Sequence, residues 1–565
     1  MAPPYELVTQ RLGPLPIVNH FLDRLGLERL FEQFIPAADA RCSLPPAKAL
    51  GVLVRSIVVE REPIYRHHEV VGAFCPAVFA LTSDQVDLLR DDQLGRALDR
   101  LFQVDRGSLL TQIVVAAAGQ FAVRLEELHN DSTTVKFTGQ YGLAKGRSLR
   151  GKRAPWITFG FSKDHRPDLR QLLFVMTTSA DGGLPVQFRC GDGQTNDSAT
   201  HIETWEALRT ATGRADFLYV ADSKLCSYEN LRHIDQQGGR LVTVLPRSRL
   251  EDGWMRKWIQ THEPAWEPVW DRPNPHRKYA PRDRWFVYRY HLPSREGWPI
   301  IWVWSTLLAL KQKQSRTERL AAAAEELAQL DRRLQGPRPR LQSRAEIGQR
   351  IEQIVRRFKV GRYLHGEIWR EEIHRFRQER RGRPGPQTRY RREVKHRPRV
   401  RWTIDQAAVQ YDEKSDGMYP LITNDETLTP AQVLAAHKRQ PGIEKRFQQL
   451  KSVHAIAPVF LKNEGRIEAL FFLYFIALLI QALIEREIRR GMQKGGVDQL
   501  SIYPEKRSCK RPTSEQVLRL FGRAERHLLL EGDRVVQVFD PQLTGIQQQV
   551  LKLLGVARQA YQSTA

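Results

Sequence analysis

The sequence predicts an α/β protein with helical regions at both ends of the chain. Three observations support this fold class. Hydrophobic residues recur every three or four positions up to about residue 120, which is the period of an amphipathic helix. Beyond about residue 125 the period becomes that of β-strands, with short apolar runs of the buried-strand type. The length of 565 residues is too great for one hydrophobic core, so several domains are expected.

Residues 121–246 are predicted to form the first part of the core, and their apolar runs give the order of its strands and helices. The first apolar run contains Asp131, and the fourth ends at Asp222. Helical segments separate the last three runs, so the order is β-β-β-α-β-α-β, which is that of a ribonuclease-H-like fold. Parallel pairing of the first and fourth strands would bring Asp131 and Asp222 close together. The strand candidates are residues 128–139, 171–180, 184–191, 216–223 and 240–246.

Residues 247–430 are predicted to interrupt this core as an inserted domain. The insertion begins with an aromatic, β-rich part and continues with polar helices. Its most basic stretch, residues 375–401, has 12 Lys or Arg and only two acids, Glu379 and Glu393. We expect this stretch to be a basic arm that follows phosphate groups; the alternative is a solvated loop that happens to be basic.

The other segments complete the predicted organisation. Residues 1–120 are expected to be helical, and residues 496–565 to form a helical tail. Between insertion and tail, residues 431–495 are expected to complete the core. Their apolar run Ala469–Ile484 has 16 residues, which is short for a bilayer span, and charged residues flank it closely. We therefore predict a buried core helix there, and no membrane partner.

The composition indicates a polyanionic partner. The chain has 88 Lys and Arg against 64 Asp and Glu, a net charge of +24. Such a surplus favours nucleic acid through phosphate neutralisation, although a basic protein of unrelated function is the alternative. Within the basic arm we expect Arg389, Arg391 and Arg392 to contact DNA. The five cysteines are scattered singly, which argues against a zinc ribbon or disulfide framework and suits a reducing cytoplasm.

Three acidic residues in three different contexts are the candidate metal ligands. Asp131 lies in a strand candidate, Asp222 ends another, and Glu444 lies on a predicted helix beside an apolar stripe. Carboxylates suit hard cations such as Mg²⁺, and two such ions can support cleavage or transfer of a phosphodiester bond. Taken alone, Asp131 could instead cap a turn, and Asp222 could cap the helix that begins near Ser227.

The local sequences around these acids resemble insertion-sequence transposases of the Asp-Asp-Glu class. The similarity is strongest to the cut-and-paste group that has a β-rich insertion and a Tyr-Arg-Glu-Lys signature around its catalytic Glu. Glu444 and Lys451, two helical turns apart, match the last two letters of that signature. Other matching stretches are FSKDHRPDLRQLLF, GDGQTNDS, DGMYPLITND and the apolar helix after KNEGRIEAL.

Two signature positions differ from the pattern. The Tyr and Arg positions are occupied by His437 and Gln440, so the usual phosphate-clamping Arg is absent from its place. The neighbouring Lys438 and Arg439 could serve instead. The resemblance implies that Lys451 contacts a phosphate near the reacting end, while a helix-surface lysine is the alternative.

The resemblance implies a DNA transposase with Asp131, Asp222 and Glu444 as catalytic metal ligands. It would use two Mg²⁺ ions, or Mn²⁺ as a substitute, in the cytoplasm of a bacterium. As a homodimer it would bind the terminal inverted repeats of its element, cleave the DNA and transfer the strand to target DNA. The helical region 1–120 would recognise DNA ends or mediate dimerisation, or else be a structural cap.

Two other functions fit the same residues. One is a transposase-derived DNA-binding protein without catalysis, acting as a repressor. The other is a metal-dependent nuclease that cuts DNA but does not join it. One metal site can perform both cutting and joining. A strand-transfer assay with a pre-cleaved end separates the two activities.

Overall fold

The computed structural model is a mixed α/β protein with a large mixed sheet and many helices. The chain forms two compact units. The first comprises Met1–Thr243, Thr423–Asp425 and Ala435–Ala565, and the second comprises Val244–Ile422 and Glu426–Leu434. The second unit corresponds closely in sequence to the predicted insertion. The residues described are 5–35, 44–60, 62–163, 166–273, 281–336, 341, 343–503, 505 and 507–563.

Five strands of the first unit lie in the order β6-β5-β2-β7-β8. β2 pairs antiparallel with β5 and parallel with β7, and β7 pairs parallel with β8. Apart from the two-residue strands β3 and β4, the elements follow one another as predicted, β-β-β-α-β-α-β. Their bounds are β2 Glu127–Phe137, β3 Ser148–Leu149, β4 Lys152–Arg153, β5 Arg170–Ser179, β6 Pro185–Gly191, α8 His201–Thr212, β7 Leu218–Ala221, α9 Tyr228–Gln236 and β8 Arg240–Val244.

A long helix, α16 (Glu464–Lys494), forms much of the core of the first unit. The ring of Phe471 lies 6.0 Å from that of Phe174 on β5, and Phe475 lies 6.0 Å from Phe188 on β6. The most apolar window of α16 is long enough to cross a membrane, but 94% of it is buried within the protein. This burial agrees with the predicted core helix, because aromatic packing accounts for its apolar faces.

The predicted helical region 1–120 is helical over most of its described length, apart from an opening strand, β1 (Glu6–Arg11). Its larger helices pack on one another and on α16 through buried aliphatic and aromatic side chains. The α-helices of this region, large and small, are α1 Leu15–Leu25, α2 Leu27–Phe34, α3 Pro46–Val59, α4 His67–Gly72, α5 Ser83–Val86, α6 Asp91–Gln103 and α7 Arg106–Phe121.

The C-terminal tail differs from the helical prediction because it also contains two strands. β15 (Glu525–Glu531) pairs antiparallel with both β1 and β16 (Arg534–Phe539), which makes a three-stranded sheet. The tail helices are α17 (Ser514–Arg519) and α18 (Gly545–Leu554). The pairing of β15 with β16 is a local hairpin around Gly532 and Asp533, a signal that the helical prediction missed. The other partner, β1, comes from the opposite end of the chain, so no local pattern in the tail could announce that pairing.

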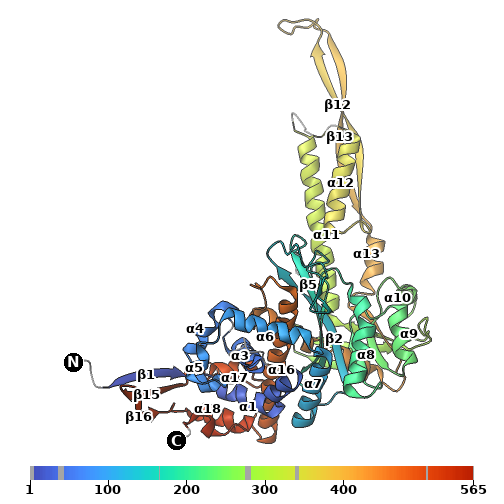
Figure 1. The fold of residues 1–565 in the computed structure, drawn as a ribbon. Helices are drawn as coiled ribbons and strands as arrows, with labels where there is room; N and C mark the ends of the chain where they lie inside the picture. Colours follow the sequence, from blue (N-terminus) through green and yellow to red (C-terminus); the bar gives the residue numbers. More distant parts are fainter. Residues whose placement is uncertain are drawn as a thin grey trace. The chain divides into compact units, whose positions relative to one another are not determined.

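The second unit contains a sheet, a pair of long helices and a β-ribbon (Figure 1). Its sheet has the strand order β14-β11-β10-β9, with every neighbouring pair antiparallel. The bounds are α10 Leu250–Trp258, β9 Glu267–Arg272, β10 Asp283–Arg289, β11 Ile300–Ser305, α11 Thr306–Leu334, α12 Arg344–Phe358, β12 Leu364–Gln378, β13 Tyr390–Ile404, α13 Gln406–Glu413 and β14 Met418–Thr423.

The predicted basic arm, residues 375–401, covers the end of β12, the turn and most of β13 in the β12–β13 ribbon, and so runs from its outer end to near its base. The two strands pair antiparallel from Leu364 opposite Ile404 to Gln378 opposite Tyr390. At the base of the ribbon, Leu364 and Val400 are buried in a core shared with α11 and α12. Further out the ribbon extends beyond the ends of these helices, and its side chains are mostly exposed (Figure 1).

Candidate active site

Asp131 and Asp222 are brought together by the pairing of two parallel strands in the first unit. The register of β2 and β7 places Asn130 opposite Ala221, so Asp131 and Asp222 are the next positions along the two strands. Asp222 directly follows the last residue of β7. The two carboxylates are close enough for their charges to interact. The edge formed by the carboxyl ends of parallel strands is a usual location for sites in α/β proteins.

The Asp131 carboxyl lies in an environment that disfavours its charge. Burial raises the pKa of Asp131 to about 6, and the nearby carboxylates of Asp222 and Asp197 contribute in the same direction. The Lys163 ammonium and the backbone N–H of Ser132, which donates to Asp131 Oδ1 at 2.7 Å, act in the opposite direction. Desolvation together with a neighbouring like charge is an arrangement found at functional sites.

Lys163 supplies a cation beside Asp131. Its Nζ lies 3.7 Å from Asp131 Oδ1 and 2.9 Å from Asp197 Oδ2. The same Nζ donates to the carbonyl and to the hydroxyl of Ser132, each at 2.7 Å. The ammonium group is therefore surrounded by oxygen atoms, as a bound cation would be.

Asp222, directly after β7, takes part in two hydrogen bonds. Its Oδ1 accepts a hydrogen bond from the N–H of Lys224 at 2.9 Å, and its carbonyl accepts one from the hydroxyl of Thr243 at 2.6 Å. The first bond shows that Asp222 caps the turn after β7. It does not cap the following helix, whose N-cap is Ser227, with its side chain accepting from the N–H of Asn230. A single acceptor bond leaves the carboxylate able to accept others, because it has two oxygens and about four lone-pair positions.

A buried polar cluster supports β2 next to Asp131. Asn130 accepts a hydrogen bond from the Thr177 hydroxyl at 2.9 Å, and its amide nitrogen lies 3.5 Å from His201 Nδ1. His201 also lies 3.0 Å from the Tyr219 hydroxyl. Burial lowers the pKa of His201 to about 4, so the cluster is neutral at physiological pH. It links β2, β5, β7 and α8 and holds the strand that carries Asp131.

Glu444 lies in the first turn of α15 (Pro441–Gln448) and is exposed. The residue before this helix, Gln440, donates from Nε2 to the carbonyl of Asn130 at 3.2 Å, and its Oε1 lies 3.4 Å from His129 Nδ1. Gln440 therefore docks the start of α15 onto β2, one helical turn before Glu444. Among the described residues, however, no three His, Cys, Asp or Glu side chains form a group that could hold a metal ion.

Arg446 anchors the same helix from its buried side. Its guanidinium donates to the carbonyls of Gly182 and Gly183, each at 2.8 Å, and to Gln449 Oε1 at 2.6 Å. Glu485 on α16 lies 3.4 Å away, and both side chains are 2% exposed. These contacts tie α15 to the β5–β6 turn and to the core.

The residues that precede α15 are engaged with the protein itself. Arg439 forms a bidentate pair with Glu127 at 2.6 and 2.5 Å. Burial alone would raise the pKa of Glu127, but hydrogen bonds from His129 and Arg439 outweigh it and lower the pKa to about 2. Burial lowers the pKa of His437 to about 4, with further contributions from Lys438 and His129. A phosphate would have to compete with Glu127 for Arg439.

The other predicted DNA contacts lie in two places. Lys451 belongs to a short π-helical segment, Gln449–Val453, that continues α15, and it lines an open pocket beside β2. Arg389, Arg391 and Arg392 lie in the second unit at the outer end of the β-ribbon, where they are exposed. Arg391 faces Arg377 across the strands, and Arg392 donates to His374 at 3.1 Å.

Sequence reasoning missed Lys163 and Asp197 as neighbours of Asp131. Both residues lie in stretches that carry the family resemblance, FSKDHRPDLRQLLF and GDGQTNDS. Those stretches were the available signal. The contacts themselves depend on the fold, because Lys163 reaches back to β2 over 31 residues and Asp197 opens the turn before α8.

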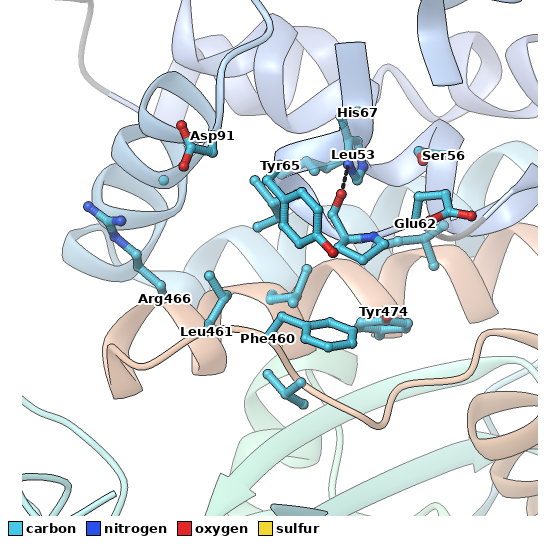
Figure 2. Close-up of a pocket in the computed structure, with 16 residues that line it drawn as sticks. Leu53, Ser56, Glu62, Tyr65, His67, Asp91, Phe460, Leu461, Arg466 and Tyr474 are labelled. Atoms are coloured by element: carbon cyan, nitrogen blue, oxygen red, sulfur yellow. Dashed lines mark hydrogen bonds between the residues drawn. The ribbon is translucent and has the colours of Figure 1, made fainter. Parts of the chain in front are cut away.

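A separate cavity of about 150 Å³ in the first unit has a different character (Figure 2). Its walls include two aromatic side chains, Tyr65 and Phe460, together with the acids Glu62 and Asp91. Arg466, which also lines it, is bound to Asp99 at 2.8 Å. None of the predicted site residues lines this cavity.

Comparison with known proteins gives a match to one family model and matches to solved structures. Residues 7–115 match a domain of unknown function (DUF4277). No curated protein matches the chain. Among solved structures, the chain is similar to the piggyBac transposase in a cryo-EM synaptic complex with hairpin DNA, at 12% identity and a TM-score of 0.25. That match covers 53% of this chain and 63% of the other, less than two thirds of its length. A similarity of this size does not assign a function.

Proposed function

We propose that this chain is a DNA transposase that cleaves and transfers DNA strands in a metal-dependent reaction. The observation that carries the proposal is the juxtaposition of Asp131, within β2, and Asp222, directly after the parallel strand β7. The order β6-β5-β2-β7-β8 supports a ribonuclease-H-like core with these acids in its site. As a homodimer, the protein would bind the terminal inverted repeats of an insertion sequence.

The charge of the chain supports DNA as the partner. The net charge is +24, and exposed arginines gather on the outer ribbon. A two-stranded β-ribbon has the dimensions to enter the major groove of B-DNA. Arginines on such a ribbon gain affinity by displacing counterions from phosphate groups.

The donor groups of Asp131 and Asp222 suit Mg²⁺ or Mn²⁺. Both side chains offer carboxylate oxygens, and the oxygen-rich surroundings of Lys163 Nζ support a stabilised positive charge beside them. The metal, when bound, would activate the attacking oxygen and stabilise the leaving oxygen. Glu444, on the helix docked at Asn130, is our proposed third ligand, and a second ion would require it.

The test is a cleavage assay on DNA that flanks the gene and contains candidate inverted repeats. We would incubate it with the protein and Mg²⁺ or Mn²⁺ and map strand breaks at nucleotide resolution. Breaks at the repeat ends should disappear in Asp222→Ala. The matched control is Asp216→Ala, which removes an exposed acid from the other end of β7, where it pairs with Arg214 at 2.6 Å.

The outcomes separate the candidate activities. Breaks that persist in Asp222→Ala would exclude this site as the catalytic one. Breaks at the repeats without transfer of a pre-cleaved end to target DNA would identify a nuclease that does not join.

A DNA-binding repressor without catalysis is the second candidate, and one observation favours it. The described residues contain no group of three His, Cys, Asp or Glu side chains that could hold a metal ion. Specific binding to the repeats without breaks, under all metal conditions, would support this candidate.

A further inference from the structure

An open pocket of about 700 Å³ lies beside the Asp131 site in the first unit. One wall is the C-terminal half of β2, including Thr134 and Lys136. Lys163, Arg166 and Leu169 form a second wall, and Lys451 with residues 456–458 forms a third. The volume is within the range of pockets that hold small molecules or parts of larger ligands.

Four cations line this pocket: Lys136, Lys163, Arg166 and Lys451. They come from three separate segments of the chain, so the fold, and not a local run of basic residues, gathers them. No carboxylate is among the residues that line the pocket in the described structure. Their convergence creates a positive potential that attracts phosphate groups.

The acids that contact Arg166 and Lys163 do not line the pocket. Arg166 forms a bidentate pair with Asp168 at 2.8 and 2.6 Å, and both side chains are more than half exposed. Exposed pairs of this kind are weak, so Arg166 can exchange Asp168 for a phosphate at little cost. Asp131 and Asp197 contact Lys163 from the side of the carboxylate site.

The pocket also has an apolar lining. Val135, Leu169, Ile456 and Pro458 contribute to it. Cations combined with an apolar lining match one strand of DNA, whose phosphates are charged and whose sugars and bases present apolar surface. The cavity of Figure 2 lacks this character, because acids and a paired arginine line it.

We propose that this pocket binds the phosphodiester backbone of the DNA strand whose reacting bond lies at Asp131 and Asp222. This inference rests on the proposed function. Lys163 belongs to both sites, since it lines the pocket and contacts Asp131. It therefore connects the bound strand to the carboxylates. Lys136 and Arg166 hold phosphates further along the strand.

The experiment measures binding of a fluorescently labelled single-stranded oligonucleotide in EDTA, over a series of salt concentrations. The variants are Lys136→Gln, Arg166→Gln and the double variant, each in the full-length chain. Each phosphate that the variant no longer neutralises should make the slope of log K against log salt shallower by about 0.7. The double variant should therefore show about twice that change. Lys136→Arg, which keeps the charge, should retain the wild-type slope.

The control is Lys494→Gln, at an exposed lysine that ends α16. It should leave the slope within error of the wild type. A double variant with the wild-type slope would overturn the pocket proposal while leaving DNA binding in place. Failure of the wild-type protein to bind any DNA would overturn the proposed function, and the pocket with it.

Discussion

Arginines have opposite roles in two regions of this protein. In the first unit, Arg446 is 2% exposed and is bound by two backbone carbonyls, Gln449 and Glu485. In the second unit, Arg391 is exposed at the outer end of the ribbon and lies opposite another arginine, Arg377. The first region surrounds its buried guanidinium with acceptors, whereas the second places like charges together.

The difference shows which arginines hold the fold and which are available to a ligand. A buried guanidinium must have its partners inside the protein, because water cannot replace them. Like charges directly across a ribbon destabilise it slightly unless an anion binds between them. Glu393 lies 3.7 Å from Arg377 and offsets part of this repulsion, so the cost in the free protein is small and a polyanion would lower it further. Site acids such as Asp131 are intermediate, since Asp131 is mostly buried and only partly neutralised.

The largest effect is expected at Arg446. Arg446→Ala removes the contacts of α15 to the β5–β6 turn, leaves two buried carbonyls without their donor, and removes one of the three cations that pair with Glu485. We expect a loss of about 3–5 kcal/mol in the free energy of unfolding. Urea unfolding followed by tryptophan fluorescence would measure it. Lys445→Ala is the matched control: Lys445 is one-third exposed and bonds the same Glu485, so the destabilisation should be clearly smaller.

A medium effect is expected from the pH dependence of Asp131. Its folded-state pKa, about 6, is above the ordinary value of 3.8, so the folded protein binds the proton more tightly than the unfolded chain. The stabilisation is present below pH 4 and is lost as pH rises to about 6. Asp131→Asn should therefore gain stability relative to wild type between pH 4 and pH 7, by about 3 kcal/mol at most.

This prediction is checked in metal-free buffer by unfolding both proteins at several pH values. If the difference in unfolding free energy between Asp131→Asn and wild type is constant from pH 4 to pH 7, the surroundings do not raise the pKa of the Asp131 carboxyl. An opposite slope would mean that Lys163 dominates over burial and Asp222.

The smallest effect on stability is expected at the ribbon. Arg391→Ala and Arg392→Ala should each change the free energy of unfolding by less than about 0.5 kcal/mol, because both side chains are exposed. The same variants should weaken binding to duplex DNA and make its salt slope shallower by about 0.9 for each phosphate left without its arginine. Unchanged DNA binding with both arginines removed would exclude the outer ribbon as a DNA-binding element.

The sequence alone was enough to predict the order of the core and the buried helix. Apolar runs of strand length and capped helices are local signals, and the β-β-β-α-β-α-β order followed from them. Once that order is known, parallel pairing of β2 and β7 brings Asp131 and Asp222 together. The basic arm was also visible as composition, although its pairing as a ribbon became clear only from the register.

Only the tertiary structure decided the contacts that join distant segments. The pairing of β1 with β15, the approach of Lys163 to Asp131 and the pocket of four cations each unite residues far apart in the chain. Glu444 illustrates the same point: its helix docks on β2 through Gln440, yet the described residues hold no three-ligand group. Periodicity and spacing report how a segment meets the core, but side-chain distances between segments depend on packing across the whole unit.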